Sequence, residues 1–300
     1  MTGLDHVLKD YEFALCLTHD VDRPYKEFRA LYYALQERPI YHLRTLFSSV
    51  NPYWQFEAIM ELEDQFGVRS AFYFLDQPSL LDRPAREWAD PKRWVQFLGR
   101  YDVTADDIAE VIQSLDQRGW EVGVHGSIPA HDDRARLRVE KAHIESVLGH
   151  PVVGGRQHYL RLAGTRTWRY QAAVGLHYDT SLGSGTEYGF QYGYEPCQPF
   201  DDEFVVFPLT LMEQALPDPS TNFEAAWTVC EALLEEAAAN DAVMTVLWHP
   251  RYFNPDEFPG YRRVYERLLK RALEMDAWVG PPSTLYDRLA LDTEEASTCY

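Results

Sequence analysis

Two aspartates placed two residues apart are the side chains of this sequence best suited to chemistry. Asp20 and Asp22 follow a short apolar run, 13–17, and such a run predicts a buried parallel strand. Because side chains alternate along a strand, both aspartates face the same side. Their charges repel unless a divalent metal, an arginine or a shared proton lies beside them. A metal, an arginine or a shared proton beside paired carboxylates is typical of active sites. The alternative has no functional meaning: the strand ends in a turn, and both side chains lie in water.

Other polar side chains stand where further apolar runs end. They are His125, Arg156, His158, Asp179 and His249. Taken singly, a histidine at a strand end is more often a hydrogen-bonded structural residue than a ligand. Together, the set supplies carboxylates, imidazoles and a guanidinium, which is the combination that suits a metal-assisted hydrolase.

The elements that must position these side chains alternate between strand-like and helix-like patterns. Apolar runs predict seven strands, which begin near residues 13, 70, 121, 152, 177, 204 and 242. Helical patterns cover 104–118, 132–148, 165–174, 223–239 and 261–275. This alternation predicts an α/β fold with a parallel sheet, and the number of strands suits an imperfectly closed β/α barrel. In such barrels the chemistry lies at the carboxyl ends of the strands.

The chain is expected to form one catalytic domain over residues 1–284. Two long irregular segments, near 24–52 and 77–101, follow strands, and this position predicts insertions that fold over the site. Residues 285–300 are predicted to be a loose acidic tail. The N-terminus has no basic stretch followed by an apolar one, and no apolar run approaches 18 residues, so neither a signal peptide nor a membrane span is predicted.

The charge of the chain argues against some classes of partner. It has 47 acidic and 28 basic residues, a formal net charge of -19, and no basic cluster of the kind that nucleic acids or anionic membranes require. An acid-rich composition with few lysines suggests adaptation to high salt, where charge repulsion is screened. Four widely spaced cysteines without a CxxC pair favour free thiols in a cytoplasmic protein. The sequence leaves the oligomeric state open.

The order of these motifs resembles that of the NodB-type polysaccharide deacetylases, carbohydrate esterase family 4. The family has an Asp pair, a His followed by Ser or Thr, an Arg-x-Pro, an Asp and a Leu-x-His. The segments that resemble these five motifs are, in order, 18–22, 125–127, 156–158, 178–179 and 247–249. The similarity spans about 13–250, so it implies the family's distorted (β/α)7 barrel for most of the chain.

The resemblance also implies a mechanism. In the family a divalent metal, usually zinc, is held by one Asp and two His, polarises an acetamide carbonyl and lowers the pKa of a bound water. Carried over by motif, Asp20 would be the general base, and Arg156 would hold it ionised. His249 would be the general acid, and Asp179 is the candidate to tune it.

The metal ligands implied by the resemblance are Asp22, His125 and a third residue that the sequence leaves open. The family's second histidine lies four positions after the first, where this chain has Pro129. His158, which faces the same way as the arginine of the third motif, is favoured over its rival His131. A site with only two protein ligands, or with no metal, is the remaining alternative. Asp and His ligands also suit iron, manganese, cobalt or nickel.

The expected function is that of a metal-dependent hydrolase that removes an N-acyl group, foremost acetyl, from an amino sugar or a glycan precursor inside the cell. Tyr159, Phe190 and Tyr192 are candidates for stacking on sugar rings, although the loop that carries the last two is as readily explained by packing. Two alternatives stay open. One is a carbohydrate-binding barrel that has lost its metal, and the other is a non-haem iron enzyme with a two-His, one-carboxylate site.

Overall fold

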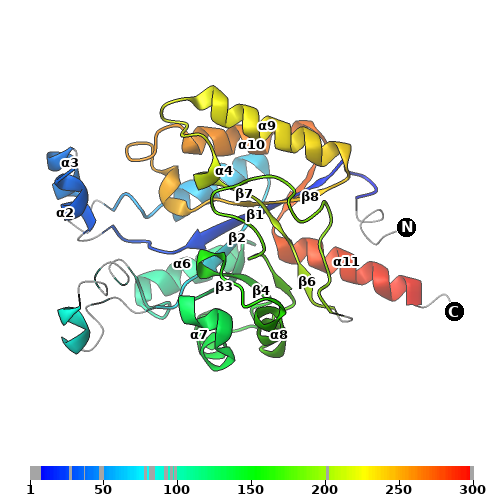
Figure 1. Ribbon diagram of the computed structural model, residues 1–300, viewed down its shortest axis with the longest axis horizontal. Helices are drawn as coiled ribbons and strands as arrows, with labels where there is room; N and C mark the ends of the chain where they lie inside the picture. Colours follow the sequence, from blue (N-terminus) through cyan, green and yellow to red (C-terminus); the bar gives the residue numbers. More distant parts are fainter. Residues whose placement is uncertain are drawn as a thin grey trace.

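The computed structural model describes residues 8–26, 29–36, 38–46, 51–77, 80, 85–90, 94, 97, 100–200 and 203–297. Its core is a parallel sheet with the strand order β6-β5-β4-β3-β2-β1-β8-β7, and β9 pairs with β1 beside this path (Figure 1). The strands are β1 (Ala14–Val21), β2 (Ala71–Phe74), β3 (Glu121–Gly126), β4 (Gly154–Gln157), β5 (Tyr178–Asp179), β6 (Val205–Val206), β7 (Leu209–Met212), β8 (Val243–Leu247) and β9 (Trp278–Gly280).

The sheet curls because its two edge strands follow each other in the chain. β6 and β7 stand at opposite ends of the strand order, yet only residues 207 and 208 join them, so their ends lie within about 11 Å of each other. Pro208 has no backbone N–H to donate to a ladder, and it divides the single strand predicted from residue 204 into two. The predicted distorted barrel is confirmed, with β6 and β7 at the two ends of the strand order.

Helices cover the barrel on two sides. α6 (Asp106–Gln117), α7 (Arg134–Leu148) and α8 (Thr165–Ala173) lie on one side, whereas α4 (Phe56–Phe66), α9 (Phe223–Ala239) and α10 (Tyr261–Glu274) lie on the other (Figure 1). β1 runs through the middle of the sheet, and all eight of its residues are buried, as its apolar sequence predicts. Among the described residues, no helix has both the length and the apolar character needed to cross a membrane.

Two consecutive glycines let β4 approach its neighbours closely. A Cβ on Gly155 would lie 2.1 Å from the backbone oxygen of Val124 on β3, and a Cβ on Gly154 would lie 1.9 Å from the ring of Tyr178 on β5. Both distances are far below van der Waals contact, so only glycine fits at these positions. The pair therefore sets the place of Arg156, the next residue of β4.

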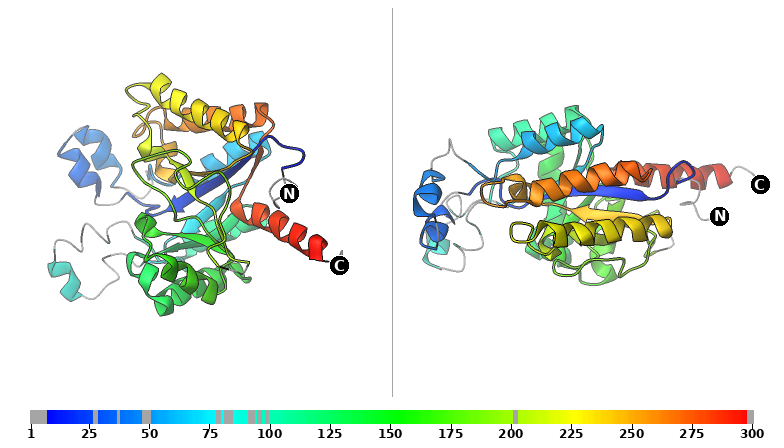
Figure 2. Two further views of the ribbon diagram at one scale, coloured as in Figure 1. Left: turned by 45° about the vertical axis from the view of Figure 1, so that its right-hand side comes forward. Right: turned by 90° about the horizontal axis from the view of Figure 1, so that it is seen from above.

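Short helices of the two predicted insertions lie beyond the carboxyl end of β1. α2 (Arg29–Ala34) and α3 (Pro39–Arg44) belong to the first insertion, and the 3-10 helix η2 (Ala85–Ala89) belongs to the second (Figures 1 and 2). Other parts of both insertions lie outside the described residues. α11, the last helix, lies at the opposite end of the barrel from α2 and α3 (Figure 2).

The C-terminal segment is helical, and the expectation of a loose acidic tail over 285–300 is wrong for its described part. α11 (Pro282–Ser297) begins soon after β9. Leu285 and Tyr286 are buried in an apolar cluster with residues of β1, β5 and β8. These apolar side chains anchor the start of the helix. The prediction of a loose tail rested on the acidic residues further along and gave these two side chains too little weight.

We expect Gly155→Ala to lower the free energy of unfolding by about 1–3 kcal/mol, because the added methyl group overlaps a backbone oxygen that cannot move away without breaking the ladder. Gly185→Ala is the control, since a Cβ there meets only the Met212 side chain at 3.5 Å, and its effect should stay within about 0.5 kcal/mol. Urea denaturation measures both, and equal stability of the two variants would contradict the packing described for β4.

Candidate metal centre

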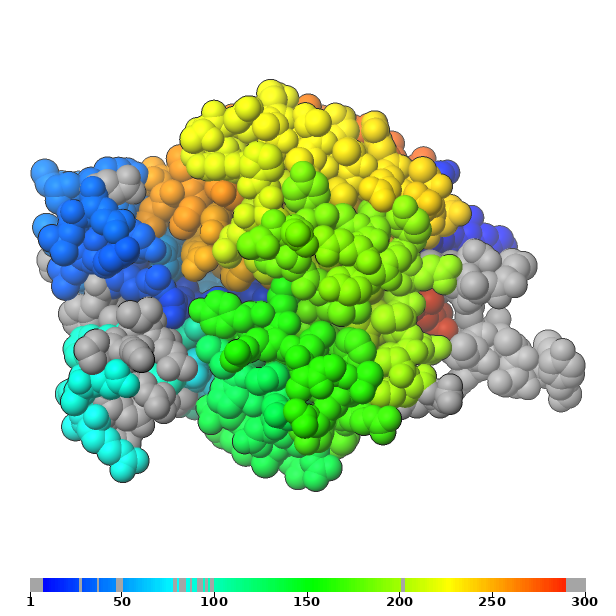
Figure 3. All heavy atoms as spheres, viewed as in Figure 1, coloured from blue at the N-terminus to red at the C-terminus, as the bar shows by residue number. Residues whose placement is uncertain are grey.

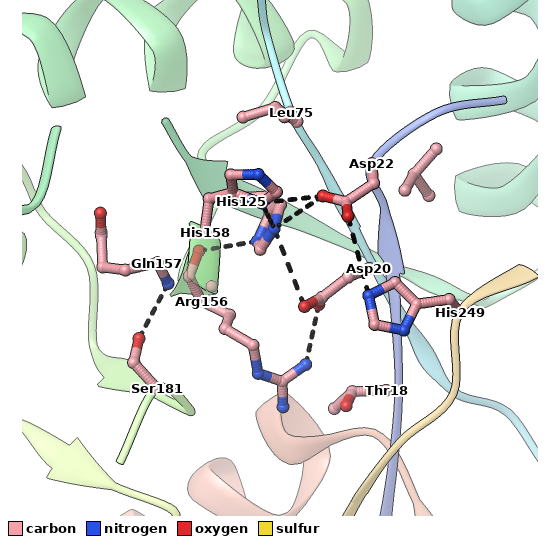
Figure 4. Close-up of polar contacts among 12 residues, drawn as sticks. Thr18, Asp20, Asp22, Leu75, His125, Arg156, Gln157, His158, Ser181 and His249 are labelled. Atoms are coloured by element: carbon pink, nitrogen blue, oxygen red, sulfur yellow. Dashed lines mark hydrogen bonds and ion pairs between the residues drawn. The ribbon is translucent and has the colours of Figure 1, made fainter. Parts of the chain in front are cut away.

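Asp22, His125 and His158 bring three ligand atoms together where β1, β3 and β4 end (Figure 4). Asp22 Oδ1 lies 3.3 Å from His125 Nε2 and 2.8 Å from His158 Nδ1, and the two ring nitrogens are 3.0 Å apart. Ligands around a tetrahedral zinc ion lie about 3.3 Å from one another, so the triangle has nearly the size that such an ion needs. The rival ligand His131 contacts the backbone oxygen of Ile128 instead and lies outside this cluster.

The surroundings of these atoms suit a cation. His125 Nδ1 donates to the backbone oxygen of Arg156 over 3.0 Å, which leaves the lone pair of Nε2 for a ligand. Burial raises the pKa of Asp22, but His158, His125 and Arg100 outweigh burial and hold this pKa well below its usual value. Asp22 Oδ1 is buried and has no well-formed hydrogen bond among the described residues. A charged oxygen of this kind, opposite two imidazole nitrogens, fits a divalent ion.

Arg100, which the sequence did not single out, borders this triangle. Its Nη1 donates to the backbone oxygen of Asp22 over 2.6 Å and lies 3.5 Å from Asp22 Oδ1. Its Nη2 donates to His158 Nε2 over 2.8 Å. A metal on Nδ1 of a neutral imidazole leaves the ring proton on Nε2, so this last contact must be exchanged when a metal binds. The three side chains fit a metal ion, and Arg100 would have to give up its hydrogen bond to His158 when the ion binds.

Asp20 lies next to the triangle with a guanidinium partner of its own. Arg156 is fully buried, and its Nη1 donates to Asp20 Oδ1 over 2.8 Å. Burial raises the pKa of Asp20, but Arg156, His125 and His249 lower it by more than burial raises it. The net result is a pKa below the usual value. Asp20 Oδ2 lies 3.8 Å from His125 Nε2. The carboxylate thus stays charged within reach of a water at the centre.

His249 faces the same centre from the opposite wall, and a glutamate orients it. His249 Nε2 lies 3.8 Å from Asp22 Oδ2, whereas Nδ1 lies 2.7 Å from Oε1 of the buried Glu213. Burial lowers the pKa of His249, but Glu213 and Asp22 raise it above its ordinary value, which favours the protonated ring. Glu213 is not among the residues predicted from the sequence, although it directly follows the largely apolar segment 209–212.

Asp179 does not tune His249, and that prediction is wrong. Asp179 Oδ1 accepts hydrogen bonds from Trp168 Nε1 over 3.0 Å and from the backbone N–H of Ser181 over 2.9 Å. Its Oδ2 accepts from Gln171 Nε2 over 2.7 Å and from the Ser181 hydroxyl over 2.6 Å. Two of these donors belong to α8, so Asp179 fastens that helix to the sheet, and its role is structural.

A cavity of about 420 Å³ opens above the centre, within the range of small-molecule sites. Tyr159 lines it, is 70% exposed and, like Leu160, holds a left-handed backbone with φ of 58° and 53° respectively, a strained conformation that clusters at functional sites. The other two predicted sugar-stacking residues are absent from the described lining. Phe190 packs on Tyr194 and the core, and Tyr192 is exposed.

Comparisons with known proteins identify the fold. No protein-family model and no curated protein matches the sequence. A solved structure from Mycobacterium smegmatis, described as a polysaccharide deacetylase, is 18% identical, with a TM-score of 0.62 over 95% of this chain and 92% of that chain. A Pseudomonas aeruginosa structure of the same description is 15% identical, with a TM-score of 0.59 over 93% and 91%. PuuE allantoinase is 15% identical, with a TM-score of 0.58 over 93% and 90%. The chain therefore has the polysaccharide deacetylase fold.

We expect Asp179→Asn to lower the free energy of unfolding by about 1–3 kcal/mol. An amide NH₂ in place of one carboxylate oxygen would face N–H and O–H donors and could not accept their hydrogen bonds. Asp10→Asn, at an exposed position, is the matched control and should change stability by less than about 0.5 kcal/mol. Thermal and urea unfolding give both values. An unchanged stability of Asp179→Asn would speak against the structural role.

Proposed function

We propose that this protein is a metal-dependent amide hydrolase that removes an N-acyl group, foremost acetyl, from an amino sugar or a glycan precursor. The observation that carries the proposal is the triangle of Asp22, His125 and His158, with charged Asp20 on one side and His249 on the other. The fold supports it, because similar structures are described as polysaccharide deacetylases and as an allantoinase. Zinc is the metal we expect, since one carboxylate and two imidazoles leave an open position for water or substrate.

The described side chains divide the reaction between two walls of the barrel. Asp22, His125 and His158 would hold a divalent ion, which would supply polarisation of the amide carbonyl and acidification of water. Asp20 would take a proton from the attacking water, and Arg156 keeps this carboxylate charged and fixed in direction. From the other wall His249 gives a proton to the leaving amine, and Glu213 holds the ring with Nε2 turned toward the centre.

We expect protein reconstituted with zinc to hold about one ion per chain, measured by mass spectrometry of the metal after removal of unbound ions. Asp22→Ala, His125→Ala and His158→Ala should each lose most of it, because two remaining ligands hold the ion weakly. His131→Ala is the matched control, since it removes a histidine outside the cluster, and should keep the metal. Full occupancy in His158→Ala, or loss in His131→Ala, would contradict the ligand set.

We expect Glu213→Gln to lower kcat by about 10- to 100-fold with little change in KM, because a charge-assisted hydrogen bond to His249 is lost. His249→Gln should lower kcat by about 10²–10⁴, and the double variant should be no slower than His249→Gln alone, since Glu213 acts only through the histidine. Acetate release from N-acetylglucosamine oligomers is the readout. Additive losses would refute this positioning role, and no acetate from any N-acetylated sugar would refute the substrate class.

A further inference from the structure

The wall of the cavity above the centre is rich in arginine. Arg23, Arg29, Arg100 and Arg251 line it, whereas its described lining contains two carboxylates, those of the aspartates at the end of β1. The composition of the chain does not account for this local excess, because the chain has 47 acidic and 28 basic residues. A positive surface inside an acidic protein calls for a specific reason.

The carboxylates of the lining already have partners. Asp20 pairs with Arg156 beneath the cavity, and Asp22 faces Arg100 and two histidines. A divalent ion at the centre would add further positive charge. The amide that is cleaved is neutral, so an acetamide group by itself gives Arg29 and Arg251 no anionic partner.

Two of these arginines hold nitrogen atoms that need an acceptor. Arg29 Nη1 and Arg251 Nε are buried and have no hydrogen-bond partner among the described residues. A buried, charged N–H without an acceptor is costly, and an oxygen of a bound anion would satisfy it. Arg251 lies in the 3-10 helix η6 (Pro250–Phe253), two residues after His249, so an anion there would lie close to the reacting groups.

A buried lysine ties the insertion that carries Arg29 to the barrel. Lys26 is only 1% exposed, and its ammonium contacts Glu257, lies 2.7 Å from His42 Nδ1 and stands 5.3 Å from the ring of Tyr41. In the space-filling view, the blue atoms of α2 and α3 adjoin the orange atoms of the segment that follows β8 (Figure 3). These contacts hold Arg29 and Arg251, which come from distant parts of the sequence, on one cavity wall.

We propose that the cavity binds a substrate with an anionic group, a carboxylate or a phosphate, beside the amide, and that Arg29 and Arg251 hold this anion. The forked guanidinium donors match both kinds of oxyanion, and a volume of about 420 Å³ accommodates a ligand of the size of a charged sugar. The part of the proposal that concerns the amide rests on the proposed function, whereas the anion subsite stands on the arginines alone.

Isothermal titration calorimetry on the zinc-loaded protein tests the subsite with three probes: N-acetylglucosamine, its 6-phosphate and N-acetylmuramic acid. All three carry the acetamide, and they add no charge, a phosphate and a carboxylate respectively. We expect at least one anionic probe to bind about 10- to 100-fold tighter than the neutral sugar. Arg29→Gln and Arg251→Gln should each remove most of this preference. Arg161→Gln, at an exposed arginine outside the lining, is the control and should keep it.

The outcomes separate this inference from the proposed function. Equal affinity for the three probes, or no binding of either anionic probe, overturns the subsite. A preference that survives in both glutamine variants also overturns it, because another group, such as the metal or Arg100, would then be holding the anion. Acetate release is measured in parallel with the same probes. Release without an anion preference overturns the subsite alone, and an arginine-dependent preference without release supports the subsite and counts against the proposed function. Arg29→Lys and Arg251→Lys, which keep the charge, should retain part of the preference.

Discussion

Two carboxylates on the same side of β1 have to remain charged beneath the protein surface, and the rest of the site follows from that constraint. Burial by itself would drive both to protonate. Asp20 is kept charged by a guanidinium from β4, and Asp22 by imidazoles from β3 and from the turn after β4. The register that places His125 opposite Arg156 delivers both kinds of partner from neighbouring strands. Parallel pairing of neighbouring strands therefore both supports the fold and places the positive groups that keep the two carboxylates charged.

The curl of the sheet gives the two aspartates a second set of neighbours. In the strand order, β3 and β4 lie to one side of β1, whereas β8 and β7 lie to the other. The first side supplies the nitrogens that hold the carboxylates, and the second supplies His249 and its partner Glu213. A flat sheet would leave these groups far apart, and the curved one sets a base and an acid on opposite walls. Water and an amide can then meet between a charged carboxylate and a protonated ring.

Much of the site could be predicted from strand ends, because apolar runs locate parallel strands and their last residues share one edge of a sheet. This rule predicts Asp20, Asp22, His125 and His249, and the structure brings these four side chains together. The same rule failed for Asp179, since β5 has only two residues and the packing of α8 decides which way its side chain points. Glu213 was not predicted because the sequence indicates one strand from residue 204, whereas Pro208 divides it and Glu213 follows the second part, β7. His158, the proposed third ligand, was predicted from alternation with Arg156, although it lies just past the end of β4.

Arg100 and the cavity arginines illustrate what a sequence pattern cannot provide. Arg100 lies at the end of an irregular insertion without periodicity, and its contacts to Asp22 and His158 depend on how that insertion returns to the barrel. Arg29 depends in the same way on the anchoring of Lys26. Long-range contacts of this kind leave no local signal, because no spacing rule relates residues that only the tertiary fold brings together.

The central claim is that Asp22, His125 and His158 form one metal site, and a crystal structure of the zinc-loaded protein with anomalous scattering at the zinc edge tests it most directly. The account predicts a single strong peak about 2.0–2.2 Å from Asp22 Oδ1, His125 Nε2 and His158 Nδ1, with Arg100 no longer donating to His158 Nε2. A peak elsewhere in the protein, or none at saturating zinc while Arg100 keeps that contact, would contradict it.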